Sequence, residues 1–292
     1  MLKRAEFIFA WLLLQSFRLM PFFILYAFSW FFFLLVYHVF RYRRKVVSNN
    51  LINSFPEKSP AERKRIACQF YRNFCDVLAE TLKGITMSEG ALKERFHVLN
   101  PGLLDDLFTQ HKSVIAIGAH YCNSEWGKIL GRQLKYPMVV IYSPFTNKYS
   151  DRYYNWSRIK FGMKLIPVSK TLRAVNELRG DPHCFIMGVD QRPFNNSNAY
   201  WHPFLNQDTP FHKGYEQIAR KFNIPVVYTD IRRVRRGYYT VHYILLSGEP
   251  AATEEGYIVG LFIKTLEGII RQKPEDWLWS HHRWKHSRGQ NN

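Results

Sequence analysis

The fold is decided by a stretch near the middle of the chain, which reads SVIAIGAHYCNSEWG from Ser113 to Gly127. Its first six residues are a short apolar run that ends in glycine, as expected of a buried β-strand. Further strand-like runs follow at residues 138–142, 183–188, 225–231 and 238–245, and helical patterns occupy residues 123–134, 148–161, 172–178, 213–222 and 254–270. Strands and helices that alternate through short connections predict an α/β fold with a mainly parallel sheet flanked by helices.

Two helices are expected before this alternating region. Residues 46–55 form a short helix that Pro56 stops. Pro60 suits the first position of a longer helix. In this second helix, apolar side chains recur at three- and four-residue intervals, at Ile66, Phe70, Phe74, Val77, Leu78 and Leu82. That periodicity is typical of a helix with one buried face.

The N-terminal part is strongly apolar. It reads LMPFFILYAFSWFFFLLVYHVF from Leu19 to Phe40, with no charged side chain if His38 is neutral. At about 1.5 Å per residue, this helix is long enough to cross a hydrocarbon layer of roughly 30 Å. The basic run Arg41-Tyr42-Arg43-Arg44-Lys45 follows, and it predicts that the next domain stays cytoplasmic. We expect a membrane anchor at residues 1–45 and a single cytoplasmic domain at residues 46–292.

Two other interpretations of this segment were weighed. A cleaved signal peptide fits poorly, because the apolar block is long and no small-residue cleavage site follows it. A helical hairpin within one leaflet is also possible for residues 5–40, with a bend at residues 18–21. Whether the anchor spans the bilayer or lies in its interface stays open at this point.

The overall charge indicates an anionic partner. The 292 residues include 41 Lys and Arg against 23 Asp and Glu, a formal net charge of +18. The apolar N-terminus favours lipid over nucleic acid, and no recognised nucleic-acid module is present. The four cysteines are scattered, at Cys68, Cys75, Cys122 and Cys184. They form no disulfide framework or thiolate zinc motif, which favours a reducing compartment.

The residues best suited to chemistry follow the strand expected at residues 113–118. His120 lies just beyond its end, and Glu125 falls in the first turn of the next helix, which Asn123 or Ser124 can cap. Ligands of open α/β sheets usually bind beyond the carboxyl ends of parallel strands. Histidine can take a proton from an alcohol, and a carboxylate on its other ring nitrogen would fix the tautomer. Taken alone, this spacing is better explained as a capped helix with an incidental histidine.

Several motifs together favour a catalytic role for His120 over an incidental one. Through them the chain resembles the bacterial lipid A late acyltransferases, the lauroyl and myristoyl transferases within the lysophospholipid acyltransferase superfamily. The resemblance covers nearly the whole chain. It rests on the order and spacing of His120 and Glu125; Arg44, Val47, Asn50-Leu51 and Phe55-Pro56; Arg158, Phe161-Gly162 and Ile166-Pro167; Asp190-Gln191; Pro203-Phe204, Thr209 and Gly214; the segment from Pro274 to Trp279; and Arg283-Trp284-Lys285.

The resemblance implies an inner-membrane enzyme that moves a fatty acyl group from an acyl-carrier-protein thioester to a hydroxyl of a lipid A precursor. It implies that His120 is the general base and that Glu125 orients and charges it. Arg158 would hold a phosphate or the developing negative charge, and Asp190 would position the His120 loop or an acceptor sugar. We count Asn123 and Gln191 with them as substrate-binding residues.

The chain departs from the family pattern at two places, both expected near the acceptor. The residues after Asp190-Gln191 are Arg192-Pro193-Phe194-Asn195-Asn196, and Ser143-Pro144 follows the strand at residues 138–142. A simpler acceptor, such as an amino-acid lipid or a lysophospholipid, is therefore the main alternative. A basic, membrane-attached binding protein without catalysis is the second alternative.

Other reactive side chains are given lesser roles. Cys122 lies two residues from His120, but the resemblance implies direct attack on the thioester and no partner for the thiol is evident. His281, His282 and His286 lack an accompanying Cys or carboxylate cluster. We therefore expect neither a metal nor another cofactor. The run from Arg232 to Gly237 lies at a predicted hairpin, where it is either a solvated tip or a surface that attracts lipid phosphates, the membrane or an acidic carrier protein.

Overall fold

The computed structural model describes residues 15–193 and 199–285. Its centre is a seven-stranded sheet in the order β1-β9-β8-β2-β5-β3-β4, in which all neighbours are parallel except the β8–β9 hairpin. The expected mainly parallel α/β sheet is confirmed. Its strands are β1 (Phe96–Val98), β2 (Val114–Gly118), β3 (Met138–Tyr142), β4 (Lys164–Pro167), β5 (Cys184–Gly188), β8 (Val226–Arg235) and β9 (Tyr238–Ser247).

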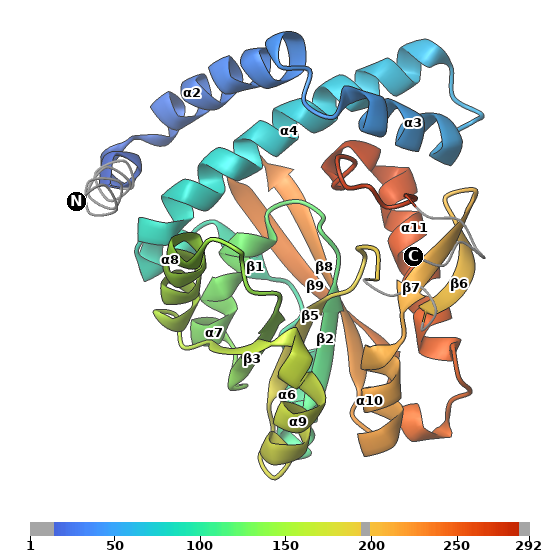
Figure 1. The fold of residues 1–292 in the computed structure, drawn as a ribbon. Helices are drawn as coiled ribbons and strands as arrows, with labels where there is room; N and C mark the ends of the chain where they lie inside the picture. Colours follow the sequence, from blue (N-terminus) through green and yellow to red (C-terminus); the bar gives the residue numbers. More distant parts are fainter. Residues whose placement is uncertain (1–14, 194–198, 286–292) are drawn as a thin grey trace.

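Helices cover both faces of this sheet (Figure 1). Strand β2 shows the consequence, because Ile115 and Ile117 pack into one core while Val114 and Ala116 pack into the other. A strand covered on both faces is apolar throughout, which explains the unbroken apolar run. The helices are α2 (Phe22–Leu34), α3 (Arg44–Ser54), α4 (Pro60–Thr86), α5 (Glu89–Lys93), α6 (Gly102–Thr109), α7 (Leu130–Gln133), α8 (Lys148–Ile159), α9 (Thr171–Leu178), α10 (Gly214–Phe222) and α11 (Tyr257–Gln272).

The single helix expected at residues 123–134 is wrong. A 3₁₀ segment, Ser124–Ile129, precedes the short helix α7. Tertiary contacts explain the difference, because two side chains of this segment bond backbone carbonyls of α4. Trp126 donates to the Glu80 carbonyl at 2.9 Å, and Lys128 donates to the Gly84 carbonyl at 2.6 Å. The sequence analysis also missed β1, β4, α5, α6 and the separate hairpin of β6 (Ala199–Phe204) and β7 (Gln207–His212).

Helix α2 lies alongside α4 (Figure 1), and a π-helical turn, Leu35–Val39, continues it. Leu25, Ser29 and Phe33 form its buried stripe. The start of α4 is fixed as the sequence predicts, by Pro60 and by a capping box in which Ser59 and Glu62 exchange hydrogen bonds. Within the described residues, the segment Phe22–Val39 is long and apolar enough to cross a membrane.

Candidate active site

Strand register brings His120 and Asp190 together. β2 and β5 are parallel neighbours, with Gly118 paired to Gly188, and each side chain follows its strand end by two residues. His120 Nδ1 lies 2.7 Å from Asp190 Oδ1. The Asp190 side chain is buried, whereas 41% of the His120 side chain is exposed. The pair therefore stands at the carboxyl edge of the sheet, with one partner fixed in the interior and the other open to a substrate.

The expected hydrogen bond between Glu125 and His120 is wrong. Asp190 occupies Nδ1, and Glu125 Oε1 accepts instead from Arg158 Nη2 at 2.7 Å. The side chains of Glu125 and Arg158 are 29% and 15% exposed, so this ion pair is largely screened from water. Arg158, expected to hold a phosphate, is thus engaged with a carboxylate. The 3₁₀ conformation after Asn123 directs Glu125 toward α8.

The electrostatics of the pair favour a charged histidine. Burial alone would lower the pKa of His120, but the charge and hydrogen bond of Asp190, together with the charge of Glu125, raise it above its ordinary value. For Asp190, burial favours the neutral acid, yet His120 and the hydrogen bond from Trp277 hold its pKa well below the usual range. Asp190 is therefore the acceptor and Nδ1–H the donor. Nε2 has no hydrogen-bond partner among the described residues and can take a proton.

A C-terminal segment holds both members of the pair. Trp277 Nε1 donates to Asp190 Oδ2 at 2.9 Å. The Leu278 amide donates to the His120 carbonyl at 3.1 Å, and the Cys122 amide donates to the Asp276 carbonyl at 2.9 Å. In the sequence this segment stands out only through the family resemblance, and no local pattern connects it with His120.

Asn123 and Gln191 differ in their surroundings. Asn123 has no exposed surface, and its Nδ2 donates to Glu80 Oε2 at 3.0 Å. It makes no side-chain cap, contrary to the expectation, and its burial keeps it from a substrate. Gln191 is partly buried and makes no side-chain hydrogen bond among the described residues. Of the two, only Gln191 is free to contact a substrate.

The remaining reactive groups are used within the fold. Burial raises the pKa of the Cys122 thiol well above its usual value, which keeps the thiol protonated. His281 Nε2 accepts from the Arg192 amide at 3.3 Å. His286 and residues 194–196 lie outside the described residues.

The arginines of the β8–β9 hairpin contact other residues of the protein, two of them on α4 and two within the hairpin itself. Arg233 and Arg236 both pair with Asp76 of α4. Arg232 pairs with Asp230, and Arg235 lies 3.8 Å from the centre of the Tyr238 ring. A purely solvated tip is therefore wrong for Arg233, whose side chain is only 9% exposed.

The family model of the bacterial lipid A biosynthesis acyltransferases matches residues 1–286. The lipid A biosynthesis palmitoleoyltransferase of Escherichia coli (strain K12) is 22% identical over 251 residues, which cover 83% of this chain and 79% of that protein. The lipid A biosynthesis acyltransferase of Shigella flexneri has the same identity and coverage. The lipid A biosynthesis lauroyltransferase of Escherichia coli (strain K12) is 23% identical over 250 residues, with the same coverage.

Proposed function

Because the chain belongs to the bacterial lipid A biosynthesis acyltransferase family, we propose that it moves a fatty acyl group from an acyl-carrier-protein thioester to a hydroxyl of a lipid A precursor. The observation that carries the chemistry is the His120–Asp190 pair, in which Nε2 of His120 has no partner among the residues that the structure describes. Imidazole backed by a buried carboxylate is suited to activating an alcohol. The acceptor hydroxyl here takes the place of a protein nucleophile.

The reaction follows from the positions of these groups. Nε2 of His120 removes the hydroxyl proton as the oxygen attacks the thioester carbonyl and forms the new C–O bond. The tetrahedral intermediate then collapses, the C–S bond breaks, and the imidazolium returns its proton to the departing thiolate. Asp190 stabilises the imidazolium through Nδ1. Glu125 adds its charge, while Arg158 holds Glu125 and offers positive charge to the developing oxyanion.

Purified variants test this assignment. His120→Ala should abolish transfer while the fold and membrane attachment persist, because positioned proton transfer is worth about 10²–10⁴-fold in rate. Glu125→Ala should slow transfer strongly but measurably, because it removes a charge that supports the imidazolium and leaves Arg158 unpaired. His183→Ala is the matched control, since His183 immediately precedes β5, at the opposite end of the same strand from Asp190. Near-normal turnover in His120→Ala would overturn the role of that residue.

Mass spectrometry of lipids tests the acceptor. Cells that lack this gene should contain a lipid A species lighter by one acyl group, and only the wild-type gene should restore the mass. Loss of an ester-linked chain from another lipid, with lipid A unchanged, would move the acceptor to an amino-acid lipid or a lysophospholipid. No change in any lipid would support the non-catalytic binding protein instead.

Membrane attachment belongs to the same proposal, with α2 lying in the membrane interface on the cytoplasmic side. Tyr26 and Ser29 of α2 bond Glu80 and Asp76 of α4, at 2.8 and 2.6 Å. Away from the face that contacts α4, large apolar side chains are exposed on α2 and on the residues that flank it. They are Leu19, Phe23, Ile24, Phe28, Trp30, Phe31, Phe32, Val39 and Phe40. A helix with one docked face and one apolar face fits a leaflet surface.

The two ends of this segment are also held by α4. Lys83 donates to the Phe17, Arg18 and Met20 carbonyls, and the Tyr71 hydroxyl donates to the Tyr42 carbonyl. A helix tied at both ends to a polar partner helix lacks the freedom to cross the bilayer alone.

Vesicle flotation tests the attachment. Phe23→Asp with Phe31→Asp should release the protein from vesicles, because each change places a charge on the exposed face of α2. Val168→Asp with Leu172→Asp is the matched control, since these two side chains are also exposed but lie at α9. Equal flotation of both double variants would contradict the proposed face.

A further inference from the structure

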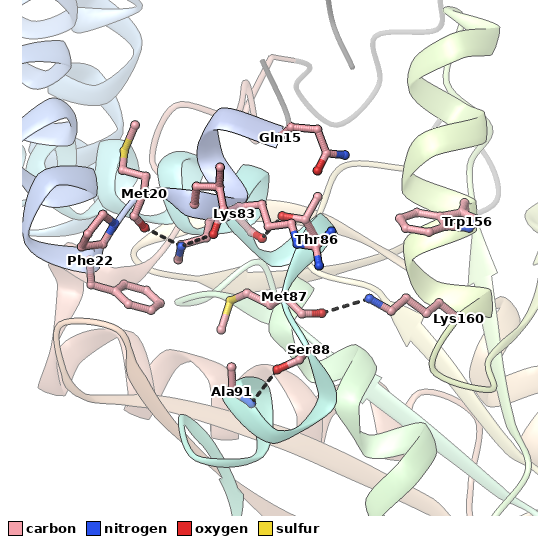
Figure 2. Close-up of a pocket in the computed structure, with 13 residues that line it drawn as sticks. Gln15, Met20, Phe22, Lys83, Thr86, Met87, Ser88, Ala91, Trp156 and Lys160 are labelled. Carbon is pink, nitrogen blue, oxygen red and sulfur yellow. Dashed lines mark hydrogen bonds between the residues drawn. The ribbon is translucent and has the colours of Figure 1, made fainter. Parts of the chain in front are cut away.

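A cavity of about 710 Å³ lies between the start of α2 and the helix α8, and it shares no lining residue with the His120–Asp190 pair. Figure 2 shows Met20, Phe22, Lys83, Met87, Trp156 and Lys160 around it. The volume falls within the range of roughly 300–1,000 Å³ that is usual for small-ligand sites.

Among the described residues, three cations line this cavity and no carboxylate does. They are Arg18, Lys83 and Lys160, contributed by three different parts of the chain. The neighbouring acid, Glu89, is paired with Lys93 instead. Lys83 donates to three backbone carbonyls and Lys160 to the Met87 carbonyl at 3.0 Å. Carbonyls satisfy the hydrogen bonds of an ammonium group but leave its charge uncompensated.

The three cations differ in what they can still bind. Burial lowers the pKa of Lys160, and the positive charge of Arg18 lowers it further, as expected where cations crowd without a counter-ion. Arg18 makes no side-chain hydrogen bond among the described residues, so its planar set of donors is available. Arg18 and Lys160 could therefore contact an anion directly, while Lys83 mainly adds charge and holds residues 17–20.

The rest of the lining is apolar and continues onto the exposed face of α2. Leu19 is 81% exposed and Trp156 is 50% exposed, and both line the cavity together with Phe22 and Met87. A positively charged site bordered by exposed apolar and aromatic side chains matches a lipid, whose headgroup is anionic and whose chains are hydrocarbon.

We propose that this cavity binds the phosphate-bearing, net-anionic headgroup of a membrane lipid between Arg18 and Lys160, with the acyl chains lying along the exposed face of α2. This inference rests on the proposed membrane attachment of α2. It gives the cavity a binding role separate from the acyl-transfer site.

Native mass spectrometry of the full-length protein in a neutral detergent tests the site, with phosphatidylglycerol as the probe. One lipid should bind saturably. Arg18→Gln with Lys160→Gln should weaken binding by about tenfold or more, because each basic residue near an anionic lipid contributes roughly 1 kcal/mol. Arg179→Gln with Lys221→Gln is the matched control, since both cations contact the Phe222 ring and neither lines the cavity. Helix α10, which ends at Phe222, lies on the opposite side of the molecule from α2 (Figure 1). Unchanged binding in the first double variant, or equal loss in the control, would overturn the proposal.

Further measurements show which lipid supplies the headgroup and whether the variant protein is folded. Phosphatidylcholine should bind at least about tenfold more weakly, and equal binding would count against a net-anionic site. If the Arg18/Lys160 double variant also raises KM for the acceptor in pure detergent, the headgroup is that of the acceptor. If KM is unchanged, the headgroup belongs to bulk phospholipid. A thermal melt checks that the variant is folded.

The binding assay separates this proposal from the earlier ones. His120→Ala should bind phosphatidylglycerol normally, because His120 is not among the residues that line the cavity. Normal flotation of the Phe23→Asp/Phe31→Asp variant, together with weakened phosphatidylglycerol binding in the Arg18→Gln/Lys160→Gln variant, would overturn membrane attachment through α2 and leave the headgroup site standing.

Discussion

The indole N–H of Trp277 donates to Asp190 at 2.9 Å, on the carboxylate oxygen that does not contact His120. Both Trp277 and Asp190 are buried. Each oxygen of this carboxylate therefore has a donor, one from the catalytic loop and one from the C-terminal segment. The Leu278 amide also donates a hydrogen bond to the His120 carbonyl. The C-terminal segment therefore positions both the base and its carboxylate.

Trp277→Phe should lower kcat and move the acidic limb of the pH–rate profile to higher pH. Phenylalanine keeps an aromatic ring but removes the donor, which leaves a buried carboxylate oxygen unsatisfied at a cost of about 1–3 kcal/mol. With one donor fewer, the Asp190 carboxylate keeps more of its negative charge for the imidazolium, so the pKa of His120 rises. Trp279→Phe is the control, because its indole donates to the Pro274 carbonyl and not to Asp190. A shift of the limb in Trp279→Phe as large as that in Trp277→Phe would contradict the specific role of Trp277.

Asp190→Asn should reduce turnover by about 10²–10⁴-fold and move the acidic limb to lower pH, opposite to the shift expected of Trp277→Phe. The base works as neutral imidazole, so activity rises with pH through the pKa of His120. Since Asp190 raises that pKa, its removal lowers the pH at which the imidazole becomes neutral. The pH dependence of kcat/KM measures the midpoint. Asp208→Asn, at an exposed acid of β7, should leave rate and midpoint unchanged, and an unmoved midpoint in Asp190→Asn would refute the assignment.

Glu125→Ala and Arg158→Ala should be strongly non-additive in kcat. Because Glu125 and Arg158 bond each other at 2.7 Å, loss of either leaves the other charged and unpaired in a poorly exposed site. The double variant should therefore be no slower than the slower single variant. The kcat values of wild type, the two single variants and the double variant, measured at steady state, give the coupling energy between Glu125 and Arg158. Independent effects that simply add would mean that the ion pair has no joint role.

Much of the fold could be predicted from local patterns. β3 begins and ends where the periodicity of residues 138–142 predicts, and α4 begins at Pro60. These elements follow from apolar periodicity and capping, both of which act over a few residues. Short β1 and β4 carry too little local pattern to be recognised, and the β6–β7 hairpin contains Pro203 and Pro210, which argue against strands.

The sequence predicts the base of the candidate site but not its direct carboxylate partner, because the two residues are far apart in the chain. His120 was identified because it follows a buried strand. Its carboxylate partner was assigned to Glu125, five residues away, whereas the structure pairs it with Asp190, seventy residues away. The sequence predicts only that Asp190 positions the His120 loop or an acceptor sugar. The register between Gly118 and Gly188 puts it against His120 itself, and register depends on the order of strands in the sheet. Trp277 was missed for the same reason.

Glu80→Gln should change how the free energy of unfolding depends on pH. The Glu80 carboxylate is fully buried, and it accepts hydrogen bonds from Tyr26, Tyr239 and Asn123. Burial raises its pKa and outweighs these hydrogen bonds, which lower it. A folded-state pKa above the unfolded one stabilises the protein at low pH. That stability is lost as the pH rises from the unfolded value, about 4.5, through the folded value.

The neutral glutamine removes this dependence. Wild type should therefore lose stability relative to Glu80→Gln as the pH rises, by about 1.4 kcal/mol for each unit that separates the folded and unfolded pKa values. Urea denaturation in neutral detergent, followed across this pH range, measures the difference. Glu177→Gln is the control, since Glu177 is exposed and paired only with Arg173 on the same helix, and its curve should stay parallel to wild type. Because Glu80 joins Tyr26 of α2 to Asn123 of the catalytic loop, a parallel curve for Glu80→Gln would mean that this junction carries no titrating charge.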